Sequence, residues 1–591
     1  MPHPNPFGWK TLAVMLYGTS LSLPTLGRSE FVQLTGTIEK KAKGVNKQVL
    51  DKLKVERERG ITGANGQGHV DFAWEVSRSL AACQGALLLV DASQGVQAQS
   101  LSVFHAAQER GLTIIPVLNK IDLPAAQPDV VAAQMQSTFG IDPKDVIKIS
   151  AKSGKGVEEV LRAIVERIPP PSGDVEAPLK AFLFDSSYDR YRGVISLVSV
   201  QNGLLKKGDK IASCYTGKKY DITDLGIMYP EEVSTSSLRP GQVGFIACNM
   251  KESSEAHIGD TLHRVGAPVE SMPGFKPAKA MVYAGIFPLD SKDFPKLEES
   301  IKRLTLTDRS VEISRESSTA LGQGCRLGFL GTLHMDVFRQ RLEDEYDANV
   351  IITAPTVPYK VVYRDRTVMV SNPTDFPDTT NTGAKFKEVL EPVVKASIIV
   401  PQEYFGDMMD LCFSHRGEEL EHRYLDTSGP SSRMILTCVL PLSEIVTDFF
   451  DKLKGRSSGF ASFDYEDAGY RPSNLAKMLF LLNGKPIDAL ALIVHRSNEQ
   501  EVGRAWVQKL HKVIPRQLFE VPIQATIGKK VIARETLSAM RADVTAGLYG
   551  GHYERKLKHL NNQKEGKRQM KRVGVVDLPQ EAFFDILRNK S

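Results

Sequence analysis

The sequence lacks the marks of several protein classes. No run approaches the ~18 apolar residues that a membrane-spanning helix needs. The six cysteines include no Cys-x-x-Cys pair, which excludes the usual zinc spacings and favours a reducing compartment. Gly-x-x-x-x-Gly-Lys-Ser/Thr, the loop that holds phosphates in many nucleotide-binding proteins, is also absent. What remains is an ordinary globular composition, and 591 residues predict three to five domains.

Positive charge is concentrated near the C-terminus. Between Lys529 and Arg572 there are twelve Lys or Arg and four Asp or Glu, so this stretch carries +8 and the rest of the chain −3. A local positive charge attracts an anionic polymer, and Tyr549 and Tyr553 lie among the charges. The stretch therefore predicts contact with RNA phosphates, with stacking on tyrosine; a solvated helix face is the alternative. The residues expected to contact RNA are Lys567, Arg568, Lys571 and Arg572.

The first 29 residues contain no acidic residue and only two basic ones, Lys10 and Arg28. A mitochondrial transit peptide is acid-poor and Arg-rich, so the segment meets one condition and fails the other. Two interpretations stay open: a targeting leader, and a disordered or misassembled N-terminus.

Residues 80–168 alternate between strand and helix patterns. Apolar runs at 86–90, 113–118 and 146–149 predict buried strands, and stretches at 97–110, 129–139 and 157–168 predict helices. Buried strands separated by helices form a parallel, doubly wound sheet. Ligands of such sheets bind at the carboxyl ends of the strands, which is where Asn119 and Ser150 fall.

Asn119-Lys120-Ile121-Asp122 directly follows one of these strands and suits the recognition of guanine. The Asp122 carboxylate can accept hydrogen bonds from N1–H and from the exocyclic amine, a pair that adenine does not offer. Asn119 can reach N7 while its other end braces the loop, and the Lys120 stem can cover the base. Ser150-Ala151-Lys152 follows the next strand, where a backbone N–H can meet the guanine O6. The combination favours a guanine site over an ordinary strand–loop boundary.

The rest of the chain changes pattern several times. Pro169-Pro170-Pro171-Ser172-Gly173 predicts a stiff linker. Short alternating segments with glycines at 177–274 predict a small β-barrel. Residues 276–363 and 391–467 mix helices and strands and predict two compact α+β domains. The remainder begins with strands and ends in the basic stretch.

Two more stretches, Arg57-Glu58-Arg59-Gly60-Ile61-Thr62 and Gly68-His69-Val70-Asp71-Phe72, complete a resemblance to translational GTPases. Beyond the nucleotide domain the chain resembles the LepA family, also called elongation factor 4, in its mitochondrial branch. The match runs from about Glu30 to the C-terminus. Its most specific stretches are residues 328–336, 353–357, 484–490 and 563–567, with Met570 and Lys571.

The resemblance implies a multidomain α/β and α+β architecture. We expect an unmatched leader, an incomplete GTPase domain of the P-loop type, a β-barrel, two α/β plaits and a C-terminal domain specific to the family. Their expected ranges are 1–29, 30–170, 176–274, 276–363, 391–467 and 475–591.

The resemblance also implies an activity. Family members bind GTP and Mg²⁺ and act on tRNA-bearing ribosomes as fidelity factors that promote back-translocation. By this resemblance Thr62 binds Mg²⁺, and His69 positions the attacking water in line with the γ-phosphate. The expected partners are the mitochondrial ribosome, rRNA and tRNA. The chain is expected to be a monomer on the matrix side of the inner membrane, attached peripherally.

The N-terminal part departs from the family in two places. Residues before Glu30 do not match it, so the phosphate loop has no counterpart. Residues 65–67 read Asn-Gly-Gln where the family has Asp-Thr-Pro, which puts Asn65 in place of a metal-anchoring Asp. Residues 63–67 span only ~17 Å when fully extended, too little for the two adjacent strands that the fold requires there. Omission of coding segments explains both departures, and a divergent relative that lost them is the alternative.

Three functions are therefore weighed. The first is a ribosome-dependent GTPase. The second is a ribosome- or RNA-binding protein without GTP turnover, which the missing phosphate loop favours. The third, an unrelated RNA-binding module, leaves the guanine loop and the order of the domains unexplained.

Overall fold

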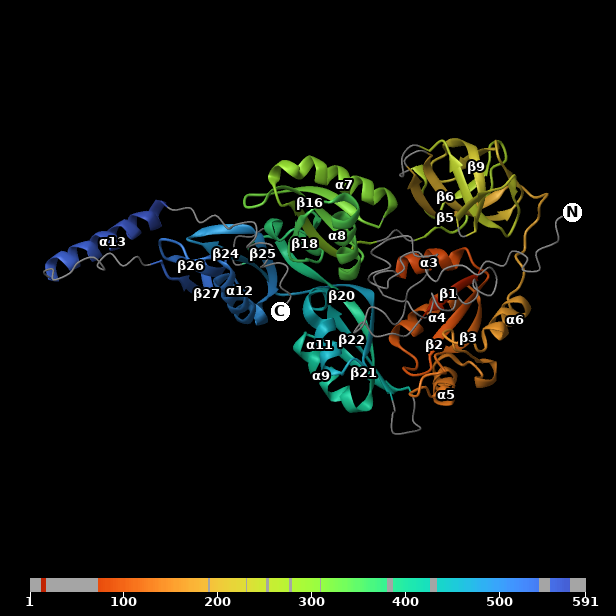
Figure 1. Cartoon of the computed structure of the whole chain (residues 1–591), viewed down its shortest axis with the longest axis horizontal. Coiled ribbons are helices and arrows are strands. Elements are labelled where there is room, and N and C mark those ends of the chain that lie inside the picture. Colours follow the sequence, from red (N-terminus) through yellow and green to blue (C-terminus); the bar gives the residue numbers. More distant parts are fainter. Residues whose placement is uncertain are drawn as a thin grey trace. The chain divides into compact units, whose positions relative to one another are not determined.

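The structure is a computed structural model (Figure 1). It describes residues 12–16, 73–189, 192–229, 231–250, 255–275, 279–308, 310–379, 386–425, 433–540 and 553–573. The chain divides into two compact units. The first consists of Met1–Lys279, Arg303–Ser310 and Val394–Asp467, and the second of Ala280–Lys302, Val311–Val393 and Ala468–Ser591.

The first unit begins with a parallel sheet in the order β1-β2-β3-β4. Its strands are β1 Leu12–Leu16, β2 Gly85–Asp91, β3 Thr113–Asn119 and β4 Ile147–Lys148, and its helices are α3 Ala73–Ala81, α4 Ala98–Glu109, α5 Pro128–Phe139 and α6 Val157–Arg167. The predicted alternation of strands and helices is confirmed. The pairing of β1 with β2 brings a segment of the expected leader into the sheet.

Both faces of this sheet are covered, because every second residue of a strand points to the same side. Ala86, Leu88 and Val90 of β2 pack in one cluster with residues of α3, α4 and α5. Leu87 and Leu89 pack in another cluster with residues of α6. The continuous apolar run of β2 is thus the pattern of a strand buried on both faces.

A β-barrel follows, as the sequence predicts. Its strands run in the order β10-β9-β12-β6-β5-β13-β8, and pairing of β9 with β8 closes the barrel. β7 and β11 form a separate pair. The strands are β5 Lys180–Asp189, β6 Gly193–Asn202, β7 Leu205–Lys206, β8 Lys210–Ser213, β9 Lys219–Tyr229, β10 Glu231–Ser234, β11 Ser237–Leu238, β12 Val243–Cys248 and β13 Thr261–Arg264.

Two regions have the β-α-β-β-α-β order of an α/β plait. One, in the second unit apart from the end of α7, has the sheet order β15-β16-β14-β17. It comprises β14 Val282–Pro288, α7 Phe294–Thr307, β15 Glu312–Ser318, β16 Gly322–Phe329, α8 Thr332–Tyr346 and β17 Val350–Ile352.

The other plait has the order β21-β22-β20-β23, and the boundary between the units runs through β20 and β23. It comprises β20 Phe386–Pro401, α9 Phe405–Ser414, β21 Glu418–Tyr424, β22 Arg433–Pro441, α11 Phe450–Arg456 and β23 Ser462–Pro472. β18 Tyr359–Tyr363 pairs with the start of β20 and with β19 Thr367–Val370.

The C-terminal domain of the second unit is an antiparallel sheet with the order β25-β24-β26-β27, covered by one helix. Its elements are β24 Leu475–Leu482, β25 Lys485–His495, α12 Glu499–Val513, β26 Val521–Ile527 and β27 Lys530–Leu537, and α13 Tyr553–Val573 follows. The shorter helical turns of the chain are η2 Pro143–Asp145, η4 Ser291–Asp293, η5 Pro373–Asp375, η6 Gln402–Tyr404, α10 Leu442–Glu444, η7 Ile445–Phe449 and η8 Arg496–Asn498.

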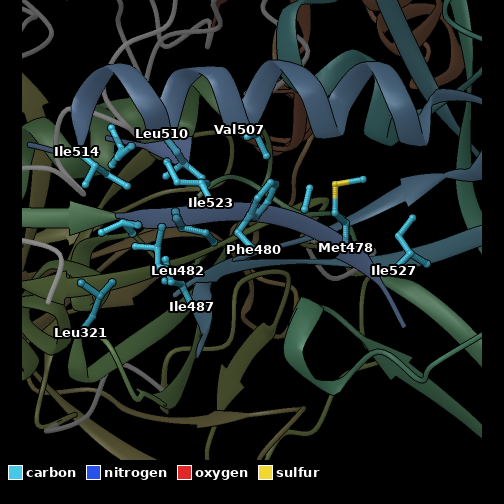
Figure 2. Close-up of a cluster of buried hydrophobic side chains, with 14 of the residues drawn as sticks. Leu321, Met478, Phe480, Leu482, Ile487, Val507, Leu510, Ile514, Ile523 and Ile527 are labelled. Carbon is cyan, nitrogen blue, oxygen red and sulfur yellow. The ribbon is translucent and has the colours of Figure 1, made fainter. Parts of the chain in front are cut away.

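The core of the C-terminal domain is continuous with that of the first plait. Figure 2 shows Phe480 and Met478 of the sheet beneath Val507 and Leu510 of α12. Leu321 of the plait belongs to the same cluster. The two domains therefore share apolar surface that neither buries alone.

Asp488 reinforces this junction. Its carboxylate accepts hydrogen bonds from the Ser318 hydroxyl at 2.8 Å, from the Thr319 N–H at 2.7 Å and from the Thr319 hydroxyl at 2.9 Å. Burial raises the pKa of Asp488, but these bonds and the one from the Ala489 N–H outweigh it and hold the pKa below its usual value.

All six cysteines are free thiols. Cys248, Cys325, Cys412 and Cys438 are buried, and Cys83 and Cys214 are half-buried. Burial raises the pKa of the Cys83 and Cys248 thiols, each to about 12. Such thiols remain protonated, and their chemistry is that of small apolar side chains.

Candidate nucleotide-binding site

Asn119 joins two loops at the carboxyl edge of the parallel sheet. It ends β3, is 1% exposed, and its Oδ1 accepts the Ala151 N–H at 2.9 Å. Its carbonyl accepts the Ala92 N–H at 2.9 Å. The predicted bracing role of Asn119 is thereby visible as hydrogen bonds to the loops that follow β2 and β4.

Lys120 is held by a buried carboxylate. Its φ of 63° lies in the left-handed region, where the backbone of a residue other than glycine is strained. Its Nζ donates to Asp91 Oδ2 at 2.8 Å, and the Asp91 side chain is fully buried. Asp91 Oδ1 in turn accepts from the Ser93 N–H at 2.7 Å and from the Ser93 hydroxyl at 2.6 Å.

Asp91 is a site residue that motif reasoning did not assign. Its signal in the sequence is a carboxylate that directly follows the apolar run of β2, which would be costly to bury without partners. Its partner Lys120 lies 29 residues further on, and only the neighbouring parallel strand brings the two together.

The residues expected to contact the base differ in exposure. Asp122 and Lys152 are exposed, whereas Ser150 and Ala151 are buried. Ser150 Oγ accepts the Ser153 N–H at 3.2 Å and so shapes the second loop. The Ala151 N–H is occupied by Asn119, and among the described residues no acceptor is recorded for the Lys152 N–H. The structure thus places the predicted guanine residues together at one edge of the sheet.

The predicted catalytic and metal residues, His69 and Thr62, lie outside the described residues and stay predictions. In the described part of the chain, no three His, Cys, Asp or Glu side chains gather in a way that could hold a metal ion. The described residues therefore assign no ligand to Mg²⁺.

The basic stretch forms α13, whose described side chains are mostly exposed. Arg568 is exposed, and Lys567 Nζ donates to the Met540 carbonyl at 2.6 Å. Lys571 and Arg572 lie in the same helix, and their side chains are outside the description. Contact with RNA stays a prediction for all four.

A parallel sheet that carries the predicted guanine loop, followed by a closed barrel and two plaits, has the architecture of a translational GTPase. Family models match in the same order: the elongation factor Tu GTP binding domain at residues 65–170, elongation factor Tu domain 2 at 193–263, the elongation factor G C-terminus at 388–479, and the GTP-binding protein LepA C-terminus at 482–588. The chain belongs to the LepA family, whose members are GTP hydrolases.

Two mitochondrial translation factors are similar in sequence over nearly the whole chain. The mitochondrial translation factor GUF1 of Laccaria bicolor is 76% identical, over 95% of this chain and 92% of that protein. The human protein of the same name is 48% identical, over 95% of this chain and 86% of that protein. The crystal structure of a Thermus thermophilus protein shares the fold, with a TM-score of 0.56 and 16% identity over 78% of this chain and 97% of that one.

The described helices include none that combines the length and the apolar character needed to cross a membrane.

Proposed function

We propose that the chain is a ribosome-dependent GTPase that acts in mitochondrial translation as a fidelity factor and promotes back-translocation of tRNAs. The observation that carries the GTPase part is the assembled loop pair Asn119–Asp122 and Ser150–Lys152. The mitochondrial and translational parts rest on the names of the relatives and on the LepA-type C-terminus.

In this proposal each residue of the guanine loop has a separate task. Asp122 accepts from guanine N1–H and the exocyclic amine, and the Lys120 stem covers the base while Asp91 holds its ammonium. Because Asn119 occupies the Ala151 N–H, the Lys152 N–H is the donor for the guanine O6. By family resemblance His69 orients the attacking water and Thr62 ligates Mg²⁺.

The test has three stages on the full chain. Binding of a fluorescent GTP analogue is measured with Mg²⁺, and then phosphate release is measured with and without mitochondrial ribosomes. Finally, toeprinting on post-translocation ribosomes reports any backward movement of the mRNA. Binding and ribosome-stimulated release support a GTPase, and backward movement supports the translocation role. Release that ribosomes do not stimulate contradicts the proposal.

A second candidate is a ribosome-binding protein without GTP turnover. It is favoured by one observation, the lack of Gly-x-x-x-x-Gly-Lys-Ser/Thr in the sequence, since that loop supplies most of the phosphate contacts in this class. Ribosome binding that is unaffected by GTP, without phosphate release, would establish it. Genomic DNA around codons 1–30 and 62–68 distinguishes a lost loop from omitted coding segments.

The place of action is also part of the proposal. We infer a monomer in the mitochondrial matrix that associates peripherally with the inner membrane. The names of the relatives support the mitochondrial part, and the membrane association rests on the family resemblance alone. Fractionation of sonicated mitochondria tests this, because a peripheral protein sediments with the membranes and is released from them only by carbonate. Light scattering of the purified chain measures its mass.

A further inference from the structure

Helix α4, which follows the loop 91–97 after β2, is docked on the plait that contains β22 and β23. The Ser462 hydroxyl accepts the Ala98 N–H at 3.0 Å, and the Phe463 carbonyl accepts the Gln99 side-chain amide at 2.7 Å. Ser102 donates to Asp464 from the next turn. A helix leaves its first N–H groups without partners, so Ser462 supplies from another domain an acceptor that α4 needs.

Apolar contacts accompany these bonds. Ala98 forms a buried cluster with Ile399, Leu425 and Ile435 of the plait, and Leu101 packs against it. Such a dry patch surrounded by hydrogen bonds excludes water from the contact.

Arg433, the first residue of β22, reaches beyond α4 to the loop before it. Its Nη1 donates to the Val96 carbonyl at 3.2 Å. Gly95 lies beside it with φ 73°, and a Cβ there would stand 3.6 Å from the Arg433 guanidinium carbon and 2.5 Å from Gln134 Oε1. Burial lowers the pKa of Arg433, whereas the Asp91 carboxylate opposes that effect.

The loop 91–97, between β2 and α4, therefore connects Arg433 to the guanine site through short, named contacts. Asp91 begins the loop and holds Lys120 at 2.8 Å, and the Gly95 N–H closes it on the Asp91 carbonyl at 2.8 Å. From Lys120 the chain continues directly to Asp122.

We propose that Arg433 is a positioning residue for guanine-nucleotide binding: by fixing the loop 91–97, it keeps Asp91 where it orients Lys120. Docking of the plait on α4 then raises the affinity for guanine nucleotide, and any partner that separates the two lowers it. Because a coupling free energy is reciprocal, bound nucleotide also favours the docked state. This inference rests on the proposed binding of guanine nucleotide.

The first measurement is dissociation of a fluorescent GDP analogue from the full chain by stopped flow. Arg433→Met keeps the aliphatic stem and removes the donor, and we expect dissociation to become about three- to tenfold faster, the range of long-range couplings. Arg433→Lys retains a donor and is expected to fall between this variant and the wild type. Arg456→Met, at an exposed position at the end of α11 in the same plait, is the matched control and should leave dissociation unchanged.

The second measurement needs no nucleotide. Hydrogen exchange by mass spectrometry is compared for peptides covering 91–97 and 119–123, and for β3 as an internal reference. Arg433→Met should speed exchange in the first two peptides and leave the reference unchanged. Uniformly faster exchange would mean a merely structural role and would overturn the inference.

The two measurements separate the possible failures. If the wild-type chain binds no guanine nucleotide, the proposed function fails and exchange alone tests the positioning of the loop. Unchanged exchange overturns the inference in every case. Faster exchange with unchanged dissociation, in a chain that does bind, overturns the link to the nucleotide. If Arg433→Met does not fold by circular dichroism, Arg433→Lys is judged by the same two criteria.

Discussion

At the scale of single residues, different side chains of the candidate site hold the loops in place and contact the proposed ligand. Asn119 and Asp91 are buried, and their side-chain oxygens accept hydrogen bonds from the protein, whereas Asp122 is exposed. A buried carboxylate without partners is costly, so Asp91 is tied to its position by Lys120 and Ser93. No described residue forms a hydrogen bond or an ion pair with the Asp122 side chain, and its substitution should therefore report on the ligand rather than on stability.

We expect Asp122→Asn to change the nucleotide preference of the chain from GTP to XTP. The amide offers an N–H₂ where the carboxylate accepted, which repels the exocyclic amine of guanine and suits the carbonyl of xanthine. We expect GTP affinity to fall by at least about 100-fold, since a mismatched polar group in a site is left unpaired. Competition between GTP and XTP for the fluorescent nucleotide measures this. Asp129→Asn, an exposed carboxylate in the first turn of α5, is the control, and an unchanged preference for GTP would contradict the assignment of Asp122.

At the scale of elements, α4 and α13 obtain their stability in different ways. α4 buries Val103, Phe104 and Ala107 and completes its first turn with Ser462. α13 is mostly polar, and most of its described side chains are exposed, so tertiary packing contributes little to it. A helix of this kind with a high density of Lys and Arg is suited to a polyanionic surface that supplies the missing contacts.

Neutralising Lys567, Arg568, Lys571 and Arg572 to Gln should weaken ribosome binding and flatten its salt dependence. Each cation that meets a phosphate releases counterions, so the slope of log affinity against log salt should fall by about 3. Sedimentation with ribosomes across a salt series measures it. The matched control neutralises four exposed cations of the first domain, Lys144, Lys148, Arg162 and Arg167. The same slope in the α13 variant and the wild type would rule out phosphate contact by this helix.

At the scale of the whole molecule, each unit combines domains that are distant in the sequence. The second unit joins the first plait to the C-terminal domain through the shared apolar cluster and through Asp488. The carboxylate is favoured as the charged form because its hydrogen bonds outweigh its burial, which makes the junction sensitive to pH.

Asp488→Asn should lower the free energy of unfolding of the second unit by about 1.5–3 kcal/mol at pH 7, the range for hydrogen bonds to a charged group. Because the pKa of Asp488 is lowered in the folded chain, its contribution is complete above the ordinary Asp pKa of about 3.9 and is lost as the pH falls through the folded value. The difference between variant and wild type should therefore shrink below about pH 4. Urea unfolding followed by Trp506, which packs against this core, measures it in a chain with Trp9→Phe and Trp74→Phe. A difference that persists at low pH would exclude the carboxylate as its cause.

The local sequence pattern was sufficient to predict features that depend on the residues of one strand or helix. The apolar run of β2 predicted a strand covered on both faces, and the positions of Asn119 and Ser150 after apolar runs placed both at the carboxyl ends of strands. The Asp91–Lys120 pair needed the register of two parallel strands. The contacts of Arg433 and Ser462 with α4 and the loop before it join residues 337 and 364 apart in sequence, and no local pattern encodes them.

The sequence by itself determined the order of the domains, the class of nucleotide and the family, because periodicity and short motifs express chemistry within a few residues. The tertiary structure alone decided that Asp91 holds Lys120, that Arg433 contacts the loop 91–97, and that the C-terminal domain shares its core with a plait. These are contacts between surfaces that only folding brings together, and burial and hydrogen bonding there depend on shape, which a linear pattern does not carry.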